Sequence, residues 1–257
     1  MNNGASSSQF VAEPSTEAGS TTLYLTRHGR TTANVMHLMQ GWSDFPLTRQ
    51  GREDVRQFGR GLRPIRFRAA WSGDLSRQYE TARLALDMSG NGDLRVGVDP
   101  DLREDNFGSF EGRDEPITLD QVCAAMGFKD FATAKATYGR DIPVHMQDTF
   151  HRLDAQDVLS AGLEKEDRAE TTAQVRGRMI GALTRIARSA IEEGGGPVLV
   201  VSSGMCLQQF LVAIDDHCPI PDMDNTAVTK VIYGDDGFRL AGPVSSMEYF
   251  QAGSPKK

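Results

Sequence analysis

The chain has 257 residues, of which 39% are hydrophobic and 25% are charged, and its formal net charge is -7. This composition is typical of a globular protein with a sizeable core. The acidic balance disfavours nucleic acid or an anionic membrane as the main partner, although a few arginines can still bind an anionic substrate in one cleft. The sparse, odd count of three cysteines favours a reducing compartment, so we expect a cytoplasmic protein.

The two ends of the chain read differently from the rest. Residues 1–20 are polar, with neither the basic nor the apolar region of a signal peptide, and we expect a disordered tail there. Residues 254–257 read as a frayed C-terminus. No apolar run approaches the roughly 20 residues of a membrane span. A single domain is therefore expected over residues 21–253.

The first half of that domain alternates short strands with helices. The expected elements are a strand within Thr21–Gly29, a helix over Leu47–Leu62, a strand within Phe67–Gly73, a helix over Asp74–Met88 and a strand within Leu94–Pro100. Thr48 and Asp74 are the predicted N-caps of the two helices. The second helix should bury one stripe formed by Leu75, Tyr79, Ala82 and Leu86.

The second half begins with a looser pattern. Residues 113–165 contain short helical pieces broken by glycine and proline, and we interpret them as a helical insertion. The clearest helix follows, within residues 169–196, and Gly194 is its predicted stop. Its predicted buried stripe is Val175, Met179, Leu183, Ile186 and Ala190. A strand over Val198–Ser202, a helix over Met205–Ile214 and a hairpin that turns near Asp235–Gly237 complete the domain.

This alternation predicts an α/β fold: a three-layer α/β/α sandwich with a mostly parallel sheet, helices on both faces and an antiparallel edge at the end. Ligands in such folds gather at the carboxyl ends of the strands. Three unusual clusters fall at such ends, namely Arg27–Gly29, Ser72–Arg77 and Ser202–Gly204.

The first cluster contains a candidate nucleophile. Arg27 and His28 follow the first strand directly, and the neighbouring cation should keep the imidazole neutral. A neutral imidazole can attack an electron-poor phosphorus, and an arginine can hold phosphoryl oxygens bidentately. Asn34 lies on the next turn and could donate a further hydrogen bond. The alternative is that Arg27 pairs with a carboxylate and His28 fills the edge of the core.

Two further charged residues have similarly open interpretations. Arg77 lies one turn into a helix, where it opposes the helix dipole unless an anion is near. That anion is either Asp74 or a bound phosphate. Glu104 follows the Leu94–Pro100 strand among other acids and aromatic rings. It is either a general acid or an ordinary surface carboxylate.

Ser203, in the stretch "PVLVVSSGMCLQQF", could be a nucleophile, a phosphate contact or a residue without a catalytic role where another residue type is expected. A nucleophilic role is disfavoured because the local sequence lacks the Gly-x-Ser-x-Gly elbow. The cysteines and histidines also lack zinc-binding spacings such as Cys-x-x-Cys, so no metal or other cofactor is expected.

Taken together, the motifs resemble a known family. The segments "LTRHGRTTAN", "MQGWSDFPLTRQG", "SGDLSRQYETA" and "LREDNFGSFEG" occur in the order and spacing of the histidine phosphatase superfamily, the phosphoglycerate-mutase-like proteins. The resemblance runs from about Leu23 to Gly253. It is closest to the broad phosphatases, because the "ERHYG"-type segment of the mutases is replaced by "REDNFGSFEGR".

The resemblance implies a role for each matched residue. His28 would be phosphorylated, Arg27 and Arg77 would hold the phosphoryl group, and Glu104 would protonate the leaving oxygen. Asn34, Gln40 and Gly41 would line the phosphate and substrate pocket. The arginines would neutralise charge without a metal ion. The 113–165 insertion would cover the active site.

At position 203 the sequence departs from the family, which has a second catalytic histidine there. A serine can donate one hydrogen bond but cannot carry a positive charge, so the resemblance implies a rate lowered by roughly 10²–10³. His145 or His151 of the insertion could supply an imidazole instead, whereas His217 is expected to be structural or solvated.

The predicted function is therefore a phosphatase that hydrolyses a phosphomonoester through a phosphohistidine at His28, with activity reduced by Ser203. The alternatives are an impaired, phosphate-binding pseudophosphatase and, less favoured, a phosphoglycerate mutase. The expected partner is a small phosphorylated substrate or inorganic phosphate, bound through Arg27, Asn34, Gln40, Gly41, Arg77 and Ser203. The substrate and the oligomeric state, a dimer included, are left open.

Overall fold

The computed structural model describes residues 19–255, and the polar tail predicted over residues 1–20 lies almost wholly outside this range. Within it, a six-stranded sheet has the order β3-β2-β4-β1-β5-β6. The strands are β1 (Thr21–Arg27), β2 (Ala69–Ser72), β3 (Val96–Val98), β4 (Gly196–Ser202), β5 (Val228–Gly234) and β6 (Gly237–Leu240). Strands β1 to β4 run parallel, β5 pairs antiparallel with β1, and β6 pairs antiparallel with β5, which confirms the predicted mixed sheet.

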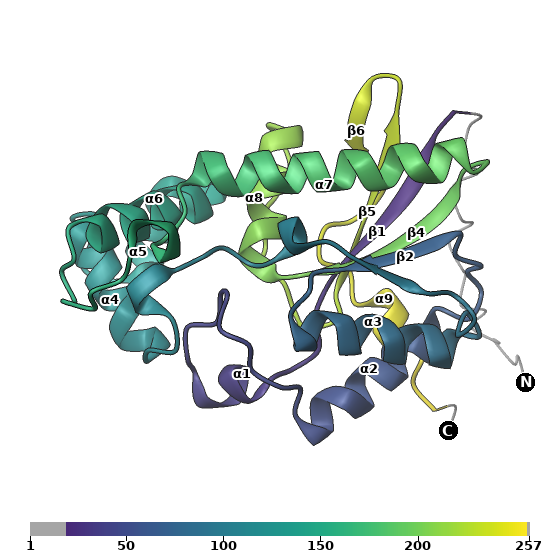
Figure 1. Ribbon diagram of the computed structural model, residues 1–257, viewed down its shortest axis with the longest axis horizontal. Helices are drawn as coiled ribbons and strands as arrows, with labels where there is room; N and C mark the ends of the chain where they lie inside the picture. The colour runs from purple at the N-terminus through teal and green to yellow at the C-terminus, as the bar shows by residue number, and fades with distance from the viewer. Residues whose placement is uncertain (1–18, 256–257) are drawn as a thin grey trace, which may run out of the picture.

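Helices cover both faces of this sheet (Figure 1). They are α1 (Thr32–Met36), α2 (Arg49–Gly61), α3 (Ser76–Ser89), α4 (Glu115–Ala125), α5 (Phe131–Tyr138), α6 (Ile142–Ala155), α7 (Thr172–Glu192), α8 (Gly204–Ile214) and α9 (Glu248–Ala252). Helices α7 and α8 pack on one face, and α2, α3 and α9 pack on the other. This is the predicted three-layer sandwich. None of the described helices is long and apolar enough to cross a membrane.

Strand β4 shows why two cores form. Val198 and Val200 pack with α7 and α8, while Leu199 and Val201 pack with α2 and α3. Successive side chains of a strand point to opposite faces, so a continuous apolar run can bury both. The predicted stripe of α7 is buried throughout, and Gly194 follows the end of that helix with a positive φ of 104°.

Three details of α3 differ from the prediction. The helix begins at Ser76, and its N-cap residue Leu75 makes no side-chain cap. Asp74 instead binds Arg103 in a bidentate ion pair of 2.5–2.6 Å, so it neither caps the helix nor pairs with Arg77. Tyr79 is exposed, since the buried face turns toward Arg77 and Gln78. The periodic pattern was misleading because this face carries polar functional side chains.

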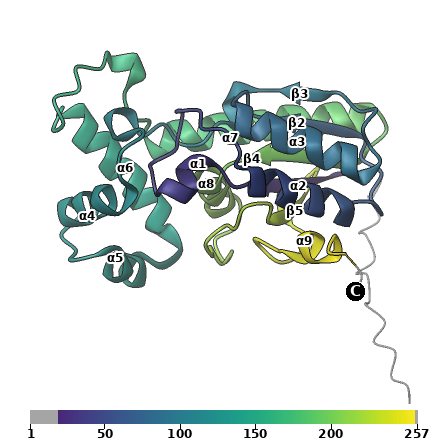
Figure 2. The same cartoon turned by 90° about the horizontal axis from the view of Figure 1, so that it is seen from below.

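Helices α4, α5 and α6, from the predicted insertion, lie beyond the carboxyl ends of the parallel strands (Figures 1 and 2). They share an apolar cluster of their own, centred on Phe110 and Phe150, whose rings are 5.2 Å apart. The cluster includes Met39 and Phe107 from the loops that leave the sheet. The helical cap is thereby attached to the strand ends where the candidate residues gather.

Candidate functional site

The tips of β1 and β4 place His28 at the base of the site. Arg27 is in register with Ser202, and the next amide, of His28, donates to the Ser202 carbonyl at 3.0 Å. Asn225 holds the His28 carbonyl from the other side at 2.9 Å. Glycine is required next, because a Cβ on Gly29 would lie 2.5 Å from a methyl carbon of Val55. The backbone around His28 is therefore rigidly held.

The imidazole of His28 is buried, neutral and has a lone pair available on one nitrogen. Its Nδ1 lies 2.8 Å from the Gly29 carbonyl oxygen, which can only accept, so Nδ1 carries the proton and Nε2 keeps its lone pair. Burial, followed by the charges of Arg77 and Arg27, lowers the pKa of His28 well below its usual value of 6.5. The imidazole is neutral at pH 7, as the sequence predicts.

Two arginines flank His28, and neither has a close carboxylate partner. Arg27 donates to the Met223 carbonyl at 2.5 Å. The fully buried Arg77 donates to the carbonyls of Gly41 and Ser43, and its nearest carboxylate is Asp44 at 3.8 Å. The Nε atoms of both arginines are buried without a partner in the described structure. These guanidinium groups favour a bound anion, because carbonyl dipoles compensate buried positive charge only in part.

Burial is also the main cause that lowers the pKa of both arginines below its usual value, and the Glu104 carboxylate opposes it. An arginine still remains charged at pH 7. A phosphoryl group between the two would supply the missing negative charge.

Glu104 is buried at the N-terminus of α8 rather than exposed on a loop. Its carboxylate accepts hydrogen bonds from the amides of Met205 (3.0 Å) and Cys206 (2.7 Å). Its carbonyl accepts from Trp42 Nε1 at 3.0 Å and from Arg178 at 2.8 Å. Five short contacts, including one from the Asp105 amide, thus set the carboxylate against the same cavity as His28.

Glu111 organises the loop that holds Arg77, a role that the sequence pattern did not predict. Its carboxylate accepts from the amides of Gly41, Trp42 and Ser43 at 2.8–3.1 Å. Gly41 and Ser43 in turn present their carbonyls to Arg77. The only available signal was the second glutamate of "LREDNFGSFEG", which pattern alone could not connect to a loop 70 residues earlier.

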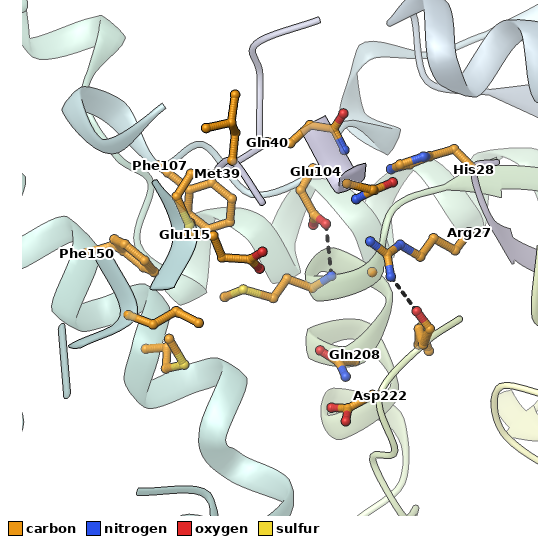
Figure 3. A pocket seen from close by; sticks show the side chains of 17 residues that line it. Arg27, His28, Met39, Gln40, Glu104, Phe107, Glu115, Phe150, Gln208 and Asp222 are labelled. Carbon is orange, nitrogen blue, oxygen red and sulfur yellow. Dashed lines mark hydrogen bonds between the residues drawn. The ribbon is translucent and has the colours of Figure 1, made fainter. Parts of the chain in front are cut away.

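A cavity of about 240 Å³ opens between the strand tips and the cap. Its polar end is formed by Arg27, His28, Gln40 and Glu104 (Figure 3), and Asn34 also lines the cavity. The apolar residues that line the cavity are Leu38, Met39, Phe107, Leu119, Met146, Phe150, Met205 and Met223. The remaining lining residues are Glu115, Gly204, Gln208 and Asp222. The cavity therefore joins an anion-binding end to an apolar compartment.

The other matched pocket residues occupy different positions. Asn34 and Gln40 line the cavity, and the Gln40 Oε1 is buried without a partner in the described structure. Gly41 lies behind the wall, where a Cβ would come within 2.2 Å of the Asp105 carbonyl oxygen. Its contribution to the site is the backbone carbonyl that binds Arg77.

Ser203 is fully buried and does not line the cavity. Its hydroxyl accepts a hydrogen bond of 2.9 Å from Nε2 of Gln78, which is also fully buried. The same Nε2 donates to the Leu102 carbonyl, so the amide is held firmly in place. The space beside position 203 is occupied by Gln78, and the predicted phosphate contact through Ser203 stays a prediction.

The other histidines lie away from the cavity. His145 stacks on Tyr138 with ring centroids 3.7 Å apart, and the His151 ring bonds the Ala169 carbonyl. Neither lines the cavity, and His37 and His217 do not either. In this conformation no cap histidine supplies the imidazole that Ser203 lacks.

The Gln78 amide leads to a prediction about restoring a histidine. Ser203→His alone should destabilise the fold by about 1–3 kcal/mol without raising turnover, because the imidazole would overlap Gln78. The double variant Ser203→His with Gln78→Ala provides room, and its hydrolysis rate should rise by roughly 10²-fold over wild type.

Thermal unfolding and steady-state hydrolysis of the two single variants and the double variant measure both effects. Gln78→Ala is the matched control for the space created. A single Ser203→His variant that is as stable and as active as the double variant would show that Gln78 does not obstruct this position.

Comparison with known proteins agrees with the fold and the motifs. The sequence matches the histidine phosphatase superfamily (branch 1) over residues 23–122 and 144–244. A 2,3-bisphosphoglycerate-dependent phosphoglycerate mutase from Parvibaculum lavamentivorans is 36% identical over 92 residues, 35% of this chain. That match spans 44% of the relative's length, less than half.

Solved structures align over more of the chain. A phosphoglycerate mutase from Bacillus anthracis superposes with a TM-score of 0.82 and 31% identity, covering 92% of this chain and 97% of that one. The Bacillus stearothermophilus protein YhfR has a TM-score of 0.62 and 27% identity, covering 89% and 99%. With the strand-tip arrangement of Arg27, His28, Arg77 and Glu104 in place, the chain belongs to the histidine phosphatase superfamily, branch 1.

Proposed function

We propose that the protein hydrolyses a phosphate monoester through a phosphohistidine formed on His28. One observation carries the proposal: a buried, neutral imidazole lies beside two guanidinium groups that lack close carboxylate partners, at the polar end of a cavity. A neutral Nε2 is the nucleophile that this reaction needs, and the two cations stabilise the three equatorial oxygens of a transferring phosphoryl group.

In the proposed reaction, His28 Nε2 attacks phosphorus in line with the ester oxygen. The phosphorus–nitrogen bond forms as the phosphorus–oxygen bond breaks, and Glu104 gives its proton to the departing alcohol. A water molecule then attacks the phosphohistidine, Glu104 takes a proton from it, and the phosphorus–nitrogen bond breaks. Inorganic phosphate leaves with His28 neutral again, so the cycle is balanced without another reactant.

The charge of the cavity supports a phosphatase over a mutase. A bisphosphoglycerate carries two phosphates and a carboxylate, and such a ligand needs several cations. Among the described residues that line the cavity, Arg27 is the only cationic side chain, with Arg77 just behind the wall. These two suit one phosphoryl group, and the compartment beyond them is apolar and acidic.

A phosphate-binding protein of little activity is the second candidate. The observation in its favour is that the Ser203 hydroxyl is engaged by Gln78 and reaches no cavity surface. Such a protein would bind phosphate through Arg27 and Arg77 while transferring phosphoryl groups slowly or not at all.

Hydrolysis and trapping of the intermediate separate the two candidates. Purified protein treated with a chelator should release p-nitrophenol from p-nitrophenyl phosphate, and acid-labile, base-stable phosphate should appear on His28 in rapid-quench samples analysed by mass spectrometry. Phosphate binding without product and without a phosphohistidine would support the second candidate and overturn the first.

A further inference from the structure

The part of the cavity beyond the phosphoryl group contains an acidic side chain that the proposed chemistry does not use. Glu115 is the first residue of α4 and lines the cavity together with the apolar residues of the cap. Figure 3 shows its carboxylate inside the cavity, near that of Glu104 and on the side facing Arg27. After Glu104, it is the carboxylate that most opposes the lowering of the Arg27 pKa by burial.

The position of Glu115 is set by the backbone. Its amide donates to the His37 carbonyl at 2.8 Å, and Leu38 forms a bridge with Asp114. Met39, which follows on the cavity wall, is bonded to the Arg113 carbonyl at 2.8 Å. The start of α4 is thus fixed to the loop that carries Gln40, so the carboxylate stays at the cavity.

The Glu115 carboxylate has no hydrogen-bond or ion-pair partner among residues 19–255. The other acidic residue at this end, Asp222, differs because it is largely exposed and paired with Lys135 at 2.8 Å. An acid in the first turn of a helix is favoured by the helix dipole, by roughly 0.3–1 kcal/mol. That effect explains an acid at this position but does not require it to point into an apolar cavity.

Resting on the proposed function, we infer that the leaving group is an apolar alcohol with a positively charged amine, which Glu115 binds. The phosphoryl group and the amine would lie at opposite ends of the substrate, one against the two arginines and the other against Glu115. The side chains of Phe107, Met146 and Phe150 line the same cavity and would contact the hydrocarbon part of the alcohol. A carboxylate at the same end of a substrate would meet Glu115 with no cation to offset the repulsion.

Three phosphonates of matched length test this without any turnover: 3-aminopropylphosphonate, propylphosphonate and 3-phosphonopropionate. Calorimetry at pH 8 and constant ionic strength should give the tightest binding for the amine and the weakest for the carboxylate. The dissociation constant should rise by roughly five- to tenfold from the amine to propylphosphonate, and again by that factor from propylphosphonate to the carboxylate, as for a partly screened ion pair. Glu115→Gln should remove the preference for the amine over propylphosphonate.

Asp120→Asn is the matched control, since Asp120 lies on the same helix but is exposed and outside the cavity lining. It should retain the wild-type order. Equal binding of the amine and the neutral compound, or a preference that survives Glu115→Gln, would overturn the inference even if the protein is a phosphatase. The predicted order of phosphonate binding in a protein that does not hydrolyse p-nitrophenyl phosphate would leave the preference of this site for an amine standing and overturn the proposed function. No binding of any phosphonate would overturn both.

Discussion

His28→Ala should abolish hydrolysis of p-nitrophenyl phosphate, with a loss on the order of 10³-fold or more, because the nucleophile has no substitute in the cavity. The other described histidines lie outside the cavity lining. Phosphorylation of the protein by substrate should disappear as well. Initial rates and the mass of the quenched protein measure the two losses.

Phosphate binding should survive in His28→Ala, because Arg27 and Arg77 remain.

The pH dependence of stability supplies a second control. The folded-state pKa of His28 lies below the unfolded value of 6.5, so the unfolded chain takes up this proton first as the pH falls. The neutral imidazole therefore favours folding less as the pH drops below 6.5. Wild type should therefore lose stability between pH 8 and pH 5 through this group, whereas His28→Ala should not. In thermal unfolding, the stability of His28→Ala relative to wild type should be higher at pH 5 than at pH 8. Unchanged hydrolysis in this variant would refute the proposed mechanism.

Glu104→Gln should slow hydrolysis of an alkyl phosphate by roughly 10²–10⁴-fold but slow that of p-nitrophenyl phosphate far less. An alkoxide is a poor leaving group and needs a proton, whereas p-nitrophenolate leaves readily without one. The two substrates, compared as kcat in the same variant, therefore separate proton donation from general damage to the site.

Such damage is expected to some extent, because the Glu104 carboxylate accepts from the amides of both Met205 and Cys206. A glutamine can accept at one oxygen only and would place its own amide donor against the other N–H. The stability of the variant should fall by about 1–3 kcal/mol in denaturant unfolding. Equal losses with both substrates would assign Glu104 to holding the start of α8, not to proton transfer.

The charged partners show where a sequence pattern stops being informative. Adjacency in the sequence suggested that Asp74 caps α3 or pairs with Arg77. In the structure Asp74 binds Arg103, and Arg77 turns to the loop at residues 41–43. The spacing along one helix cannot indicate which of several arginines a carboxylate meets, because partners from other loops compete for it.

The sequence by itself determined the strand tips and the order of the layers, since apolar runs and the residues directly after them are contiguous in the chain. For Arg27, His28, Arg77 and Glu104 the local pattern left a structural role open, and only the resemblance to the family predicted them as one set. Tertiary structure alone decided that Glu111 organises the loop around Arg77, that Gln78 fills the space beside Ser203 and that Glu115 faces the cavity. Each of these depends on contacts between segments distant in the sequence, whose side chains meet only once the sheet and the cap have formed.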